Sequence, residues 1–286
     1  AAFRESEGIA AVLGVADILL FWRVAEPPVT KIAETRIRKV LAEPFRNREF
    51  RSFIRFMCFW HFAAMVGAPF ISLFLLAEVG MSLPRLLLLW VFCWVGGAMC
   101  AARIGALVER FGHRPILILC TLLKSSNMTA LILVPNNPEL AFQILVPVFI
   151  LDSILNAGFV VATNGFMLTK SPAGNRTMFI AAGTALAGLV GGITSVACGG
   201  LLTYTKLHTV VFGMDLSSYR LLFAVSLLLR LASVLLVVRI REQDAHGTRH
   251  VVSQLIGATP LRMVRFPVGL FRSENDAVES ENVGDN

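Results

Sequence analysis

Charged residues are scarce in this sequence, and their scarcity excludes an ordinary soluble domain. They make up 16% of the 286 residues, and hydrophobic residues make up 56%, against about 25% and 45–50% in soluble domains. The hydrophobic residues fall in long runs, whereas the charges cluster between the runs. One ordinary core would not bury so much apolar surface, so we expect lipid to be the solvent for much of the chain.

Sequence patterns for metal binding and for several enzyme classes are lacking as well. The chain contains no HExxH, GxSxG, glycine-rich phosphate loop or paired Asp-rich motif, each of which places chemical groups at a fixed spacing. All five cysteines fall within apolar runs and none forms a CxxC pair, which argues against a metal site and a disulfide framework. We predict no enzymatic activity, no metal and no other cofactor.

Seven apolar runs are candidates for membrane-spanning helices, each of which needs about 20 mostly apolar residues. The first run is short and contains Asp17. The predicted spans are residues 9–24, 56–76, 86–107, 115–134, 140–168, 178–202 and 221–238. The chain is therefore predicted to be an all-α, multi-pass membrane protein, a bundle of about seven transmembrane helices with the lipid bilayer as its first partner.

The net charge of +7 comes from basic residues that alternate between the two sides of this topology. Nineteen Lys and Arg residues lie in the connections and tail on one side, against four on the other. Because Lys and Arg are retained on the cytoplasmic side, the N-terminus is predicted outside and the C-terminus in the cytoplasm, in the inner membrane of a bacterium. The basic residues form no aromatic-interleaved patch, so we predict no nucleic-acid partner.

The connection between the third and fourth spans carries a recognisable motif. It reads Gly105-Ala-Leu-Val-Glu109-Arg110-Phe-Gly112-His-Arg114, with glycines that permit close helix contact at Gly105 and a tight turn at Gly112. This resembles the cytoplasmic loop signature of the major facilitator superfamily (MFS), Gly-x-x-x-Asp-Arg-x-Gly-x-Arg, with Glu109 in place of Asp. The acid and the arginines are expected to pair across helix ends in one state of a gate and to separate in the other.

Other stretches are similar to the second half of that superfamily. Trp60-His-Phe-Ala and Ala68-Pro69-Phe70 resemble its start, residues 164–172 with Asn175-Arg176 resemble the end of its tenth helix, and the Gly-rich sixth span resembles its eleventh. The resemblance implies a twelve-helix fold of which this chain is a fragment: helix six, the central linker and helices seven to twelve. A second placement, with the motif in the first half of the fold, leaves one span too many ahead of it.

The resemblance also implies a division of the chain and a function. Residues 1–24 would be the last helix of the N-terminal half, 25–55 a basic cytoplasmic linker, 56–240 the six-helix C-terminal half, and 241–286 a cytoplasmic tail that is disordered at its end. The linker is either an amphipathic helix on the membrane surface or a solvated tether.

The implied function is secondary active transport of a small solute by alternating access, with a coupled proton or cation as a further candidate partner. The missing N-terminal helices of the same protein would be needed, so residues 1–286 alone are not expected to transport. The alternative is a non-transporting membrane sensor or assembly protein on the same scaffold.

Ionisable groups inside spans are costly, about 2.5–3.5 kcal/mol each at the helix centre, and are therefore functional candidates. Lys124 in the fourth span and Asp152 in the fifth lie near mid-depth, and Asn156 shares a helix face with Asp152. We expect these faces to meet and form an ion pair. The pair either binds substrate or a coupling proton, or it only fixes helix packing.

Two further candidates for substrate binding are Trp60 and His61 in the second span, which would line the cavity if it corresponds to helix seven. The alternative is that His61 is hydrogen-bonded to a neighbouring helix. Pro69 is expected to kink this span because proline removes a backbone hydrogen bond. Asp17 and Arg230 are expected to be structural or to reach the membrane surface.

Small residues recur in two spans and are expected to be contact surfaces, because they let helix backbones approach closely in lipid. The third span carries Gly97, Ala101 and Gly105 at every fourth position. The sixth span carries a denser stripe, made of Gly188, Gly191, Gly192, Ser195, Gly199 and Gly200.

An odd number of spans places the two ends of the chain on opposite sides of the membrane. We expect a reporter fused after Asn286 to be active in the cytoplasm and one fused before Ala1 to be active outside. Paired reporter fusions, one active only in each compartment, measure this. Two ends in one compartment would contradict the seven-span count.

Overall fold

The computed structural model describes residues 15, 19, 43–172, 176–204, 209–211 and 214–240. The chain divides into two compact units, residues 1–39 and 40–286, and the helices and strands between residues 43 and 240 all belong to the second unit. The first predicted span, most of the predicted linker and the tail from residue 241 lie outside the described residues, apart from the isolated positions 15 and 19.

The described part of the second unit is almost entirely helical. Its elements are α3 (Arg48–Gly67), the 3-10 helix η1 (Ala68–Phe70), α4 (Ile71–Ala77), α5 (Leu83–Phe111), α6 (His113–Leu123), α7 (Ser125–Leu133), α8 (Pro138–Lys170), α9 (Arg176–Tyr204), β1 (Thr209–Val211), β2 (Met214–Leu216) and α10 (Ser218–Val238). The helical elements make up six candidate membrane spans, each long and apolar enough to cross a membrane. These coincide with the last six predicted spans, while the short antiparallel hairpin β1–β2 was not predicted.

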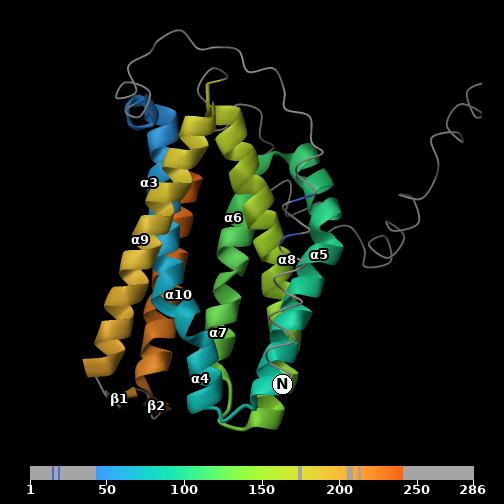
Figure 1. The fold of residues 1–286 in the computed structure, drawn as a ribbon, viewed down its shortest axis with the longest axis vertical. Coiled ribbons are helices and arrows are strands. Elements are labelled where there is room, and N and C mark those ends of the chain that lie inside the picture. The colour runs from blue at the N-terminus through green and yellow to red at the C-terminus, as the bar shows by residue number, and fades with distance from the viewer. Residues whose placement is uncertain are drawn as a thin grey trace, which may run out of the picture. The chain divides into compact units, whose positions relative to one another are not determined.

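The helices pack as a bundle in which α3 contacts α9 and α10, while α8 contacts α5 and α6 (Figure 1). The segment α6–α7 lies between these groups and contacts α10 and α8. Close approach of α3 and α10 depends on a small residue, since a Cβ added to Gly67 would lie 3.2 Å from Phe223 Cδ1. The Ser226 hydroxyl donates a 2.7 Å hydrogen bond to the Ala63 carbonyl across the same contact.

Helix α3 begins at Arg48, earlier than the predicted span that starts at residue 56. Its first turns have two faces: Arg51 and Arg55 are exposed, whereas Phe50 and Phe53 are buried. Phe53 stacks on Phe166 of α8, with ring centroids 5.1 Å apart. Aromatic packing therefore extends the helix into a basic segment that hydropathy alone placed in the linker.

Pro69 interrupts the second predicted span, as expected. Helix α3 ends at Gly67, a 3-10 turn occupies Ala68–Phe70, and α4 continues from Ile71. Proline at the start of such a turn costs no hydrogen bond that the turn itself requires. The break is therefore local, and the two helical pieces still form one long apolar span.

The loop motif lies at the α5–α6 junction, and only part of its expected structure is present. Gly112 has φ 90° and ψ 164° and separates the two helices, so the predicted tight turn is confirmed. The close helix contact predicted at Gly105 is not present within the described residues, since a Cβ there would meet no described atom within 4 Å. Arg114 Nη2 donates a 2.7 Å hydrogen bond to the Val238 carbonyl and ties α6 to the end of α10. Glu109 and Arg110 are exposed.

The glycine stripes are contact surfaces at some positions only. A Cβ on Gly97 would lie 2.5 Å from Ser153 Oγ of α8, and one on Gly191 would lie 3.1 Å from Met65 Cγ of α3. Three other glycines of α9 meet no described atom within 4 Å, namely Gly188, Gly192 and Gly200. For these three, the expected helix contact is absent from the described part of the chain.

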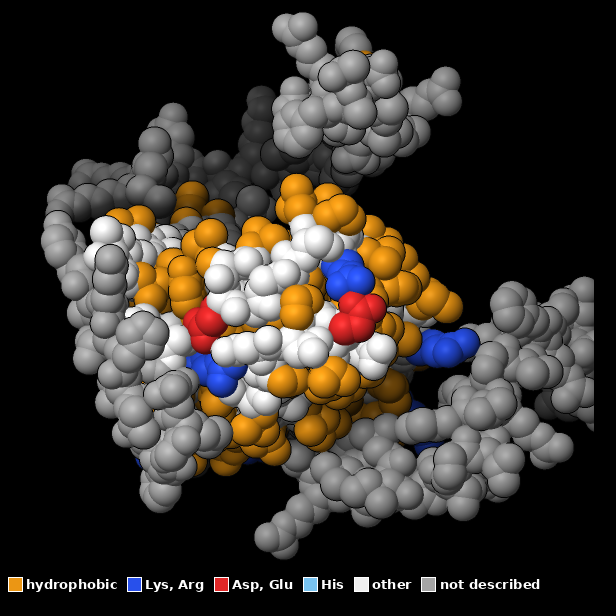
Figure 2. All heavy atoms as spheres, turned by 90° about the horizontal axis from the view of Figure 1, so that it is seen from below, with side chains coloured by type: hydrophobic (Ala, Val, Ile, Leu, Met, Phe, Trp, Pro, Cys, Tyr) orange, Lys and Arg blue, Asp and Glu red, His pale blue; other side chains and the backbone are white. Residues whose placement is uncertain are grey.

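Polar contacts close the end of the bundle where α4, α8 and α10 meet their loops. Figure 2 shows acidic and basic side chains side by side on this end. Arg85 and Glu139 form an ion pair of 2.6 Å, and Arg220 Nε lies 3.5 Å from Glu78 Oε1. Arg220 also donates to the Val134 carbonyl at 3.0 Å, so it connects α4, α7 and α10. Helix α8 starts behind an N-cap, since Asn137 accepts from the Glu139 amide.

The two glycines of the loop motif should respond oppositely to alanine. Gly112 has a backbone conformation that is essentially restricted to glycine. Holding another residue in it costs about 1–3 kcal/mol, so Gly112→Ala should lower the unfolding free energy by that amount. Gly105 is inside a helix with open space at Cβ, so Gly105→Ala should raise it by about 0.5–1 kcal/mol. Unfolding of the purified chain by a denaturing detergent measures both. Equal effects would contradict the difference in backbone constraint.

Candidate functional site

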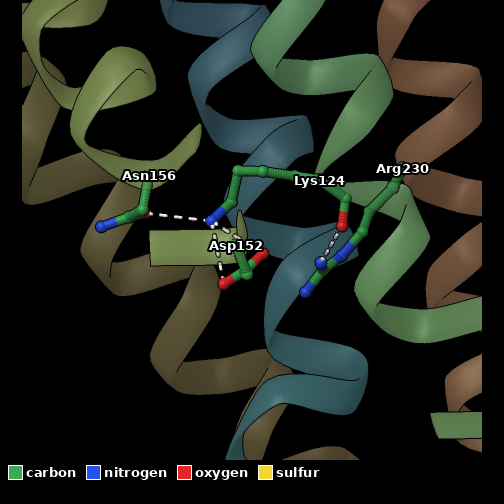
Figure 3. Close-up of polar contacts among 4 residues, drawn as sticks. All are labelled: Lys124, Asp152, Asn156 and Arg230. Atoms are coloured by element: carbon green, nitrogen blue, oxygen red, sulfur yellow. Dashed lines mark hydrogen bonds and ion pairs between the residues drawn. The ribbon is translucent and has the colours of Figure 1, made fainter. Parts of the chain in front are cut away.

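The predicted ion pair between the fourth and fifth spans is present. Lys124, at the junction of α6 and α7, places its Nζ 3.3 Å from Asp152 Oδ1 of α8 and donates to Asp152 Oδ2 at 3.4 Å. The same ammonium donates to Asn156 Oδ1 at 3.1 Å. Figure 3 shows the lysine side chain reaching across to these two residues, which lie one helical turn apart. Three of the predicted site residues therefore meet at one point.

Arg230 of α10 joins this pair, and sequence reasoning missed it. The residue is only 3% exposed, so of the two expectations for it, the reach to the membrane surface is wrong and a structural role remains. Its Nη1 donates to the backbone carbonyl of Lys124 at 3.3 Å, as Figure 3 shows. Its guanidinium also lies 5.6 Å from the centroid of the Trp60 ring, a cation–π contact. The sequence signal that could have assigned Arg230 to the site is its position in the middle of an apolar helix.

All three charged residues lie far from the ends of their membrane spans. Lys124 is eleven residues after His113 and nine before Leu133, the bounds of its span. Arg230 is twelve residues after Ser218 and eight before Val238. Asp152 is similarly placed within α8. Charges at such positions are expensive in a bilayer unless protein groups or water solvate them, so the three residues supply much of one another's solvation.

The cluster is open on one side of α8. The Lys124 side chain is 9% exposed and that of Asp152 is 19% exposed, whereas Asn156 is fully on the exposed side of the helix. Asn164 is exposed on the same face, two turns along the helix. Asn156 is therefore the exposed polar residue next to the cluster, and the exposed Val160 separates it from Asn164.

Several buried polar atoms near the α6–α7 junction have no hydrogen-bond partner among the described residues. These atoms are Ser125 Oγ, Asn127 Oδ1 and Arg230 Nε, while Asp152 Oδ1 is in the ion pair with Lys124. Buried polar groups are nearly always paired with protein, water or ligand. The polar atoms beside this mid-depth cluster therefore have hydrogen-bonding capacity that the described residues do not use.

The other two candidates separate in the structure. Trp60 belongs to the cluster, because its ring contacts Arg230 and stacks on Phe159 of α8 at 4.9 Å. His61 points elsewhere: its Nδ1 lies 2.9 Å from the Met57 carbonyl of its own helix, and it borders Gly191 of α9. The alternative of a hydrogen bond to a neighbouring helix is therefore not what the structure shows.

No protein-family model matches this chain, and no curated protein is similar to it. The site is therefore interpreted from its own geometry and chemistry.

The buried pair should show strong energetic coupling. Removing one member of a buried ion pair costs about 3–5 kcal/mol because the other charge stays behind, and partial exposure of Asp152 places the expected loss at the low end. We expect Asp152→Asn and Lys124→Met each to destabilise the chain by about 3 kcal/mol, and the double variant to lose clearly less than the sum. Detergent-induced unfolding of the four proteins measures the coupling.

The surface pair Arg85–Glu139 is the matched control, since its side chains are 41% and 65% exposed. Its coupling should be about 0–1 kcal/mol. A Lys124–Asp152 coupling no larger than that of the surface pair would show that the cluster contributes no buried electrostatic interaction.

Proposed function

We propose that this chain is the C-terminal half of a secondary transporter of the major facilitator type, in which Asp152 contributes to substrate or ion binding. The observation that carries the proposal is the charged cluster at mid-depth, which is partly exposed at Asp152 and borders the exposed Asn156 of α8. A surface with an exposed amide next to charged groups is a poor surface for lipid. It is suited to line a water-containing path, and transporters bind their substrates near the bilayer midplane.

Two further features support a larger assembly around the described bundle. Helix α9 presents Gly188, Gly192 and Gly200 without a described neighbour, and small residues favour close helix packing in membranes. Helix α5 exposes bulky apolar side chains such as Trp94, at 77%. The α5–α6 loop and the second predicted span, which Pro69 interrupts, resemble the superfamily. On that resemblance, the proposed partner is the N-terminal half of the same carrier.

Alternating access gives this arrangement a mechanism. One half of the protein would rock against the other around a site at the midplane, and the α8 face would be open to each side in turn. Asp152 would hold substrate or a coupled proton or cation while Lys124 compensates its charge when the site is empty. In the second candidate function, a sensor or assembly protein, the same cluster would only fix helix packing.

Substitution of Asp152 in the whole open reading frame that encodes these residues tests the proposal. Cells that express it should take up or expel at least one small solute in a saturable manner, detected by mass spectrometry of labelled metabolites. Asp152→Asn should remove at least about nine-tenths of that flux, since losing about 1.4 kcal/mol of binding lowers affinity tenfold. Residues 1–286 alone should show no saturable flux.

Glu139→Gln is the matched control, because it removes a carboxylate from the same helix at an exposed position and should leave the flux unchanged. Normal flux in Asp152→Asn would remove Asp152 from the mechanism. Absence of any solute flux from the well-folded, full-length protein would favour the non-transporting alternative.

A further inference from the structure

The charged cluster contains more positive than negative charge. Lys124 and Arg230 each contribute a cation, and Asp152 contributes the single carboxylate. Of the other acidic residues in the described helices and loops, Glu78 and Glu139 form ion pairs with arginines at one end of the bundle, and Glu109 lies beside the α5–α6 junction at the other. Glu43 precedes α3, Glu49 is in the first turn of α3, and Asp215 is in β2. Within the described residues, one positive charge at mid-depth is therefore left without an acidic partner.

The groups that surround the excess charge are dipoles only. Arg230 contacts a carbonyl oxygen and the face of Trp60, and Lys124 contacts the amide oxygen of Asn156 in addition to Asp152. Such contacts lower the cost of a buried cation but do not neutralise it, and an uncompensated charge in a low-dielectric interior remains expensive. A bound anion would neutralise the excess positive charge and remove this cost. The cluster therefore favours negatively charged ligands over neutral or positively charged ones.

Hydrogen-bond donors are available where the cluster is open. A lysine ammonium has three N–H groups, and two acceptor residues are described for Lys124, Asp152 and Asn156. The Asn156 amide brings two more N–H groups on the exposed side of α8. The open face of α8 therefore has N–H groups of Lys124 and Asn156 that can donate to a ligand.

We propose that the Lys124–Arg230–Asp152 cluster recognises a ligand with a single negative charge, bound beside Lys124 and Asn156 on the open face of α8. This inference names the substrate class of the site and rests on the proposed function. The charge is that of a carboxylate on a small organic acid or of a monovalent inorganic anion. Of the roles proposed above for Asp152, this leaves the binding of the coupled proton or cation, while the anion lies on the side of Lys124 that faces the amide of Asn156.

Neutralising the excess charge without changing side-chain shape is the decisive experiment. Asn156→Asp is nearly isosteric and places a second carboxylate within reach of Lys124 Nζ, because Asn156 Oδ1 already lies 3.1 Å from it. Asn164→Asp is the matched control, since it adds the same charge on the same helix face away from the cluster. Thermal unfolding of the purified chain in lipid nanodiscs is measured with sodium benzoate and with benzamide, at equal ionic strength.

For the native chain and for Asn164→Asp, benzoate at several times its dissociation constant should raise Tm by about 2–4 °C, and benzamide should not. Asn156→Asp should lose this rise. Sodium nitrate and sodium chloride form further arms: a rise with them as large as with benzoate identifies an inorganic anion at the cluster, and a rise with benzoate alone identifies an organic acid. Equal responses to benzoate and benzamide, or an unchanged response in Asn156→Asp, would overturn the proposal.

A second variant keeps the test decisive if Asn156→Asp does not fold. Lys124→Gln also cancels the excess charge, and it should abolish the benzoate response in the same way. The binding measurement needs no transport, so the two proposals fail separately. Benzoate binding without solute flux in the full-length protein would overturn transport, whereas flux of a neutral solute without any anion response would overturn the anion site.

Discussion

The requirement to solvate ionised side chains inside a bilayer organises the centre of this bundle. Lipid offers no hydrogen bonds, so a mid-depth cation must find its partners on neighbouring helices. Lys124 finds a carboxylate and an amide on α8, and Arg230 finds a carbonyl at the α6–α7 junction and an aromatic face on α3. Four segments of the chain are thus held at one point by electrostatics and not by apolar packing.

The aromatic residues of α3 and α8 complement this polar centre. Trp60 contributes one face to Arg230 and packs against Phe159, so a single side chain connects the charged cluster with the apolar core. Further along, Phe53 stacks on Phe166 and Phe50 meets Phe179 of α9. In lipid, where apolar surface gains little by leaving the solvent, such close packing is a main source of helix association.

Charges at the ends of the helices have a different role. Arg220 and Arg85 meet acidic partners at one end, and Arg114 binds a backbone carbonyl at the other. The exposed pair Arg85–Glu139 costs little and contributes little, whereas the side chains of Arg220 and Glu78 are only 14% and 19% exposed. These contacts fix loops and helix ends, whereas the mid-depth cluster combines cost, partial exposure and unpartnered polar atoms, which is the combination typical of functional sites.

Much of this architecture follows from the sequence alone. The position and number of six of the predicted spans, the interruption at Pro69 and the turn at Gly112 were predicted because hydropathy, the missing proline N–H and the freedom of glycine act locally. The pairing of Lys124 with Asp152 was also predictable, since two opposite charges at equal depth have strong reason to meet. The early start of α3 was not, because it depends on contacts of Phe50 and Phe53 with distant helices.

Only the tertiary structure decided which helix faces meet. It placed Arg230 beside Lys124, separated His61 from the cluster, and left Gly105 and Gly192 without described neighbours while Gly97 and Gly191 are in contact. A helical repeat specifies which residues share a face but not what that face opposes, because the rotation of each helix is set by packing against all its neighbours at once. The excess of positive charge could therefore be recognised only after three helices were assembled.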